Sequence, residues 1–81
     1  MHQFCNDPID VVVDFSGQRV KPTSIHWNNR HYPIPRVNLV HGAREGQKRI
    51  FYFSVSDDTN FMKLRFDTEN LTWHLIEFYA D

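Results

Sequence analysis

IFYFSVSDDTNFMKLRFDTENLTWHL, residues 50–75, has the clearest strand pattern in this chain. Apolar and polar residues alternate along it, which is typical of β-strands with one buried face. The alternation is interrupted at DDTN (57–60) and DTEN (67–70), two groups of turn-forming residues. Four-residue loops at both places predict three antiparallel strands with these apolar rows on one face: Val55, Met62 and Leu75; Phe53, Leu64 and Trp73; Phe51, Phe66 and Leu71. A slip of one residue would turn each apolar set to the solvent, so the register is strongly specified.

The other strands follow from the same period and from turn residues. Residues 9–15 alternate in the same way, and turns are expected at 16–17, at 28–29 and in a loop over 41–47. Residues 50–55 would be prone to aggregate at a sheet edge, so they are expected to form a central strand. The sequence therefore predicts an all-β fold, a single small antiparallel meander of about six strands that forms a bent, partly open, SH3-like barrel.

Prolines constrain how these strands pair. Pro22 predicts a bulge, which would let Val20 and Ile25 both point inward. Pro33 and Pro35 remove donors on the side of the strand that faces away from its hairpin partner. The strand at residues 30–35 is therefore expected to be an edge at its start, or to bend before it pairs again.

The segment SIHWNNRHYPIP, residues 24–35, predicts a tight hairpin. Asn28 and Asn29 favour a type I′ turn, because both central residues of that turn need a positive φ. Trp27 and Arg30 then flank the turn, where the guanidinium can lie on the indole. His26 and His31 form the next pair, close enough to chelate a transition metal, but no third ligand lies at an obvious spacing.

Composition suits one domain over residues 1–81. The chain has 81 residues, 41% of them hydrophobic and 15% aromatic, and a formal net charge of -1. Cys5 is the one cysteine, so neither an intramolecular disulfide nor a multi-cysteine zinc site can form. The first residues do not follow the pattern of a secretory signal, and no apolar run is long enough to span a bilayer. We therefore expect a soluble, cytoplasmic protein with no membrane partner.

Positive charge is concentrated in residues 18–49, which hold seven Lys or Arg residues and one acid, Glu45. Such polarity favours an acidic or phosphate-bearing partner. A second group of polar residues shares the sheet face opposite the apolar rows, either as an ordinary solvated surface or as a contact surface. Trp27 and Tyr32 are either base-stacking platforms or core anchors. The candidate residues for binding nucleic acid or an anion are Arg30, Arg36, Lys48, Arg49, Tyr52, Lys63, Arg65 and His74.

Catalysis finds little support in the sequence. Motifs for an activated serine, a phosphate loop, a zinc protease or a dinucleotide site are absent. Cys5 with a histidine could supply a nucleophile and a base, but it lies in an N-terminal segment that we expect to be mobile. We therefore predict a protein that is not an enzyme, with no catalytic residues and no cofactor.

Three functions remain open. The first is a non-catalytic interaction module that binds a protein partner or forms a homodimer through Phe61, Ile76 and Phe78, which the predicted register places off the core face. The second is a weak nucleic-acid-binding domain that uses the basic 18–49 segment. The third is a metal-binding domain that uses the cross-strand pair of His26 and His31.

The chain also resembles a bacterial family of small all-β domains of unknown function. The family has a W-x-G-R-x-Y hairpin after a strand that contains proline, and it ends with a tryptophan strand and an Asp. The matching residues here are Pro22, Trp27, Arg30, Tyr32, Trp73 and Asp81. Asn29 replaces the usual glycine, and the central loop lacks the tryptophan often found there. Some family members are encoded beside, or fused to, proteins related to translesion DNA polymerases, so the resemblance implies a role near DNA repair.

Overall fold

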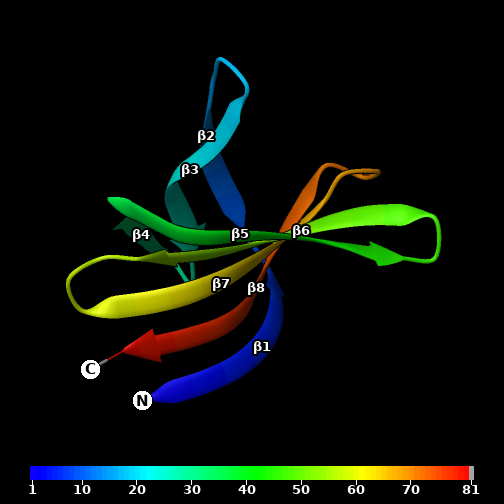
Figure 1. Ribbon diagram of the computed structural model, residues 1–81. Coiled ribbons are helices and arrows are strands. Elements are labelled where there is room, and N and C mark those ends of the chain that lie inside the picture. The colour runs from blue at the N-terminus through cyan, green and yellow to red at the C-terminus, as the bar shows by residue number, and fades with distance from the viewer. Residues whose placement is uncertain (81) are drawn as a thin grey trace.

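The computed structural model describes residues 1–80, which form eight β-strands and no helix (Figure 1). The strands are β1 (His2–Pro8), β2 (Asp10–Ser16), β3 (Arg19–Trp27), β4 (Arg30–Pro33), β5 (Arg36–Glu45), β6 (Lys48–Ser56), β7 (Asn60–Asp67) and β8 (Thr72–Ala80). Within this part of the chain, no helix has the length and hydrophobicity required to cross a bilayer. Asp81, the last residue of the family resemblance, lies outside the described residues.

The strands form two antiparallel sheets. One sheet has five strands in the order β1-β8-β7-β6-β5, and the other has three in the order β2-β3-β4. Figure 1 shows the β2–β3 hairpin rising away from the five-stranded sheet, so that the two sheets do not close into a barrel. The all-β, antiparallel and partly open architecture is as predicted, but the number of strands is eight rather than six.

The two additional strands have separate causes. Residues 30–45 divide at Ile34 and Pro35 into β4 and β5, which belong to different sheets. The N-terminal segment was expected to be mobile, but it forms β1, which pairs with β8 from His2↔Tyr79 to Pro8↔His74. The predicted loop over 41–47 is also wrong, because β5 continues to Glu45 and a two-residue turn at 46–47 leads into β6.

The predicted register is confirmed between β6 and β7 and is shifted between β7 and β8. Phe51, Phe53 and Val55 lie opposite Phe66, Leu64 and Met62, as expected. Phe66 and Leu64, however, lie opposite Trp73 and Leu75, two residues further along β8 than predicted. The shift keeps every side chain on its predicted face except at the ends of the strand. Leu71 falls in the loop with φ 57° and is 72% exposed.

Asp67 explains the shift. Its Oδ1 accepts hydrogen bonds from the backbone amides of Glu69 at 2.9 Å and Asn70 at 3.1 Å, so it starts the turn from within β7. The loop therefore occupies residues 68–71 instead of 67–70. Burial alone would raise the pKa of Asp67, but hydrogen bonds from the Asn70 amide, Lys48 and the Glu69 amide outweigh it and lower that pKa.

A bulge in β8 moves Phe78 into the core. Lys63 pairs with Glu77 and Leu64 with Leu75, so Ile76 is the extra residue and the strand reverses its faces beyond it. Phe78 is only 5% exposed, and its ring lies 5.1 Å from that of Trp27. The prediction that Phe78 faces away from the core is therefore wrong.

The N-terminal hairpins follow their turn chemistry. Asn28 and Asn29 have φ of 56° and 62°, and Trp27↔Arg30 and His26↔His31 are paired as predicted. The bulge expected at Pro22 is present. Consecutive residues of β2 pair with Ser24 and then with Pro22, so Thr23 is the extra residue of β3. β4 is an edge of its sheet, and β6 is central, as expected.

The core lies between the two sheets and is closed at one end by Trp27. Ile25 and Trp27 from the three-stranded sheet pack on buried residues of the larger sheet, which include Met62, Leu64 and Leu75. Trp27 is 8% exposed, and its Nε1 donates a hydrogen bond to Asp7 Oδ2 at 2.9 Å. Tyr32 is half-buried beside it. Both rings are therefore core anchors rather than exposed stacking platforms.

Candidate functional site

The face of the five-stranded sheet opposite the core brings four predicted binding residues together. Tyr52, Arg65 and His74 form one cross-strand row on β6, β7 and β8. Lys63 lies in the next row, with its Nζ 5.5 Å from the centre of the Tyr52 ring. His74 stands opposite Arg65 rather than opposite Lys63 as predicted, because of the two-residue shift of β8. Its Nδ1 is buried without a hydrogen-bond partner within residues 1–80.

An acid neutralises much of this face. Glu45 accepts hydrogen bonds from Arg65 Nη2 at 2.7 Å and from the Tyr52 hydroxyl at 3.2 Å. The bond from Arg65 lowers the pKa of Glu45, and it raises the pKa of the guanidinium in turn. The single acid of the basic segment is thus placed against a cation of the predicted site, and a phosphate would have to displace it.

The other four predicted residues are dispersed. Lys48 donates to the buried Asp67 at 3.2 Å, and Arg49 lies 6.0 Å from the centre of the Phe51 ring. Arg30 lines a crevice beside the N-terminus. Lys48 also lies opposite Glu45, the acid that Arg65 contacts, whereas nothing links Arg30 or Arg49 to the cations of the sheet face within residues 1–80.

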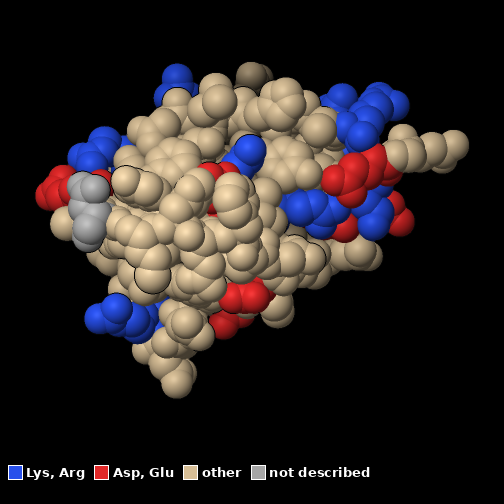
Figure 2. Space-filling model, turned by 90° about the horizontal axis from the view of Figure 1, so that it is seen from below, with Lys and Arg blue, Asp and Glu red and all other residues tan. Residues whose placement is uncertain are grey.

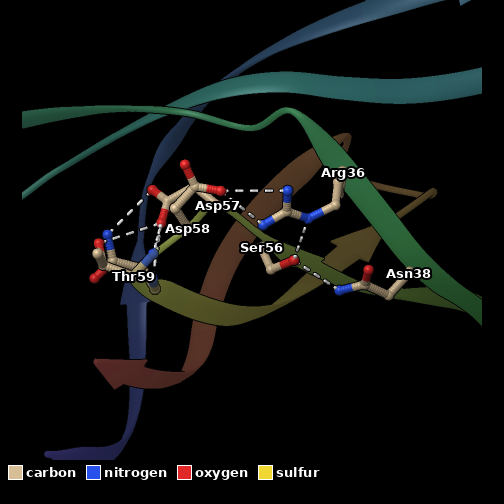
Figure 3. Close-up of polar contacts among 7 residues, drawn as sticks. Arg36, Asn38, Ser56, Asp57, Asp58 and Thr59 are labelled. Carbon is tan, nitrogen blue, oxygen red and sulfur yellow. Dashed lines mark hydrogen bonds and ion pairs between the residues drawn. The ribbon is translucent and has the colours of Figure 1, made fainter. Parts of the chain in front are cut away.

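Arg36 lies at the start of β5 and is held by contacts across the strand (Figure 3). Its guanidinium donates to Ser56 Oγ at 3.4 Å and to Asp58 at 3.4 Å. Asp58 is exposed, so the ion pair contributes little and can be replaced by another anion. Asp57 beside it caps the loop through the amides of Thr59 and Asn60.

Charges of both signs are adjacent on the face of the molecule that Figure 2 shows. Figure 2 shows one face, on which blue and red side chains are adjacent at the end where the β5–β6 hairpin lies and no uninterrupted blue patch covers the centre. The excess of cations in residues 18–49 therefore does not appear as one positive surface on this face. Nucleic-acid binding by the whole predicted set loses support from this arrangement.

The predicted protein interface is not assembled either. Phe78 is buried, and Phe61 and Ile76 are half-buried. Large exposed apolar side chains lie elsewhere, among them Phe15 on β2 and Leu39 and Val40 on β5. The two β5 residues point to opposite sides of their strand.

The predicted metal pair is present as a pair only. His26 and His31 are exposed and opposite each other, and Asp10 lies opposite His26 on the other side. Despite this row, residues 1–80 contain no group of three or more potential ligands arranged to hold a metal ion.

Cys5 is not placed as a nucleophile. Its Sγ donates to the carbonyl of Leu75 at 3.3 Å. Burial raises the pKa of the Cys5 thiol, and the charge of Asp7 adds to the effect. The thiol is therefore protonated at neutral pH, and a protonated thiol is a poor nucleophile.

A groove lies between the two sheets, and we call it the intersheet groove. Its walls are residues 18–21 at the start of β3 and residues 35–38 with Val40 at the start of β5, and its floor is Phe51, Phe53 and Phe66. Its volume is about 810 Å³, within the range typical of ligand sites. Arg19, Lys21 and Arg36 line it, and no Asp or Glu among the described residues does.

The sequence does not predict this groove, although it indicates most of the residues that form it. The alternation placed Phe51, Phe53 and Phe66 on the apolar face, and the basic segment contains all three cations. What the sequence did not indicate is that the β2–β3 hairpin turns away and leaves Phe51 and Phe66 half-buried, whereas Phe53 is only 3% exposed.

Comparison with known proteins adds no relative. No family model, no curated protein and no solved structure matches this chain. The resemblance to the bacterial family of small all-β domains thus stays a prediction.

Proposed function

We propose that this chain is a non-catalytic interaction module that binds a protein partner through the intersheet groove. The observation that carries the proposal is an apolar floor left open between two sheets. Monomeric domains normally cover contiguous apolar surface, and an open groove with a charged rim is typical of interaction sites. The free thiol of Cys5 agrees with a cytoplasmic location.

The groove is composed for binding rather than for chemistry. Its floor is aromatic and its rim carries Arg19, Lys21 and Arg36, none of which is a general base at neutral pH. It holds no histidine, cysteine or carboxylate among the described residues that could act as a nucleophile or shuttle a proton. A ligand held there would be recognised by shape and charge.

A second candidate is binding of single-stranded nucleic acid in the same groove. Its support is the combination of three cations with the half-buried rings of Phe51 and Phe66, since bases stack on aromatic side chains beside basic residues. The association of the resembled family with translesion polymerases points in the same direction. We rank it second because nearly neutral chains bind nucleic acid weakly.

The test is a selection from an unbiased library of short random peptides, using the wild-type chain and two matched variants. Val40→Arg places a long side chain in the groove, whereas Leu39→Arg adds the same charge to the neighbouring residue, which does not line it. We expect the selected peptides to bind the wild type and Leu39→Arg but not Val40→Arg. Failure to enrich any peptide, or equal binding to both variants, would overturn the proposal.

A further inference from the structure

We infer that the occupant of the intersheet groove is an acidic, extended peptide that adds a strand to the free edge of β5. This inference rests on the proposed function and specifies its ligand. Three features of the protein support it: the backbone groups that border the groove, the charges that line it, and the differences between the sheet edges.

Both walls of the groove present unpaired backbone groups. A two-residue turn joins β5 and β6, so Glu45↔Lys48 is a hydrogen-bonded pair and every second residue of β5 bonds to β6. The N–H and C=O groups of Val40 and Gly42 therefore point away from β6. On β3 the same reasoning from Ser16↔Arg19 directs those of Val20 away from β2. β4 pairs only with residues 24–27 and does not cover them.

The gap therefore corresponds to a missing strand. The β5 border has unsatisfied donors and acceptors at successive outward-facing residues, whereas the β3 border offers only those of Val20. With the apolar floor, this is the environment of a strand that pairs with β5 and packs on one face. Gly42 leaves space beside the Phe51 ring because it has no side chain; a Cβ at this position would lie 3.3 Å from that ring. A glycine on an edge strand lets another backbone approach closely.

The edges differ in how well they are protected against pairing. β4 has four residues and ends in Pro33, and β1 has a bulge and ends in Pro8. β5 has ten residues and no proline, and beyond its bulge at Asn38 it is regular to Glu45. It also exposes Val40 by 48%. β2, the remaining edge, has seven residues and carries the exposed Asp10 and Asp14. β5 is thus the longest edge that is open to an added strand.

Charge selects the partner. Arg19 and Lys21 have no ion-pair partner within residues 1–80, and the pair between Arg36 and Asp58 is weak because both are exposed. Arg19 and Lys21 on one wall beside an apolar floor match a strand in which acidic residues alternate with apolar ones. Arg36 lies at the other wall, with its guanidinium held by Ser56 and Asp58. The apolar side chains would face Phe51 and Phe66, and the carboxylates would reach the walls.

The experiment uses two synthetic eight-residue peptides in which Val and Phe alternate with Glu or with Lys. Titration by isothermal calorimetry should give binding of the Glu peptide at least about tenfold tighter than that of the Lys peptide, with an affinity that falls as salt increases. The variant Arg19→Glu with Lys21→Glu should reverse the preference. Arg30→Glu with Lys63→Glu, the same number of charge reversals outside the groove, is the matched control and should leave the preference unchanged.

Strand addition has its own readout. Two versions of the Glu peptide are compared, one N-methylated at its odd-numbered amides (one phase) and one at its even-numbered amides (the other phase). Methylation in one phase should abolish binding and methylation in the other should not, because only every second amide of an added strand bonds to β5. Hydrogen exchange should slow at the amides of Val40 and Gly42 when the peptide binds. Equal loss in both phases, or no protection, would contradict strand addition.

The outcomes separate this inference from the proposed function. Library peptides that bind the groove but are basic, or that tolerate N-methylation in both phases, would overturn the inference. The proposed function, a protein-binding module, would stand. Absence of any groove-dependent peptide would overturn both. Salt-sensitive binding of a ten-nucleotide oligothymidylate that is lost in Val40→Arg would show that the groove binds nucleic acid, and it would overturn the inference of a peptide ligand. A dimer in light scattering that Val40→Arg dissociates would make a second copy the occupant and overturn the inference.

Discussion

The hydrogen bond between Trp27 and Asp7 predicts a measurable link between the two sheets. Nε1 of the buried indole donates to Asp7 Oδ2 at 2.9 Å, and Asp7 belongs to the edge strand β1 of the larger sheet. A hydrogen bond to a charged group contributes about 1.5–3 kcal/mol, and leaving its buried donor without an acceptor costs about 1–3 kcal/mol. Asp7→Ala should therefore destabilise the fold by about 2 kcal/mol.

This loss is large for a chain of this length. Total stability is expected at roughly 4–12 kcal/mol, from about 0.05–0.15 kcal/mol per residue. A loss of about 2 kcal/mol should lower Tm by about 8–16 °C, given about 4–8 °C per kcal/mol in small domains. Asp10→Ala, an exposed Asp with no hydrogen bond among the described residues, should change stability by less than about 0.5 kcal/mol.

The assay is urea unfolding followed by far-ultraviolet circular dichroism, because one variant changes the fluorophore. In the Trp27→Phe background the indole donor is gone, so Asp7→Ala should cost less than in the wild type. An equal cost in both backgrounds would refute the claim that this bond stabilises the fold. A cost no greater than that of Asp10→Ala would refute it as well.

Three further predictions test the fold. Phe78→Ala should cost about 3–5 kcal/mol in urea unfolding because the ring is buried against Trp27, whereas Phe4→Ala, on the exposed surface, should cost less than about 0.5 kcal/mol. Leu71→Gly should stabilise the chain by about 0.5–1 kcal/mol, since it relieves a positive φ on an exposed leucine; a lower Tm would contradict this. Asp67 has a lowered pKa, so its carboxylate stabilises the fold above the ordinary value of 3.8 and loses this effect as pH falls through the folded pKa. Asp67→Asn should lower Tm at pH 7 and flatten its decline below pH 4, and a parallel pH profile for both proteins would count against it.

The sequence predicted best those features that local chemistry determines. The β6–β7 register follows from alternation on both sides of one loop, and Asp57 caps that loop as its residue type suggests. The turn at Asn28 and Asn29 needs only residues that tolerate a positive φ, and the bulge needs only Pro22. Each of these features depends on residues that are close in sequence.

Features that depend on distant residues were missed. β1 pairs with β8 across almost the whole chain, and its own sequence, HQFCNDP, does not alternate. The two-residue shift of β8 preserves the faces of the strand, so hydrophobic alternation alone cannot distinguish it from the predicted register. The side chain of Asp67 decided between the two, and this effect is visible only once its hydrogen bonds are known.

The same distinction explains the candidate site. The sequence identified Arg65 and Tyr52 as neighbours because both lie on adjacent strands of a predicted register, and this is confirmed. It did not indicate that Glu45 would approach them, since the predicted loop over 41–47 hid the extension of β5. Ion pairs between residues that are distant in sequence therefore neutralise much of the predicted anion site.

Protection of the sheet edges gives the strongest argument for an intermolecular role. Residue types that prevent pairing are present where the chain has other edges: Pro8 in β1, Pro33 in β4, and two exposed aspartates on β2. On β5 the stretch from Leu39 to Glu45 has no proline and no bulge, and its charged residues, Arg44 and Glu45, stand only at the end beside the turn. The rest of this stretch exposes two large aliphatic side chains. An unprotected edge of this kind promotes aggregation unless something pairs with it. Because the open edge borders an apolar floor and a cationic wall, a strand of matching charge would satisfy the backbone, the floor and the wall at once, and a small ligand would satisfy at most two of them.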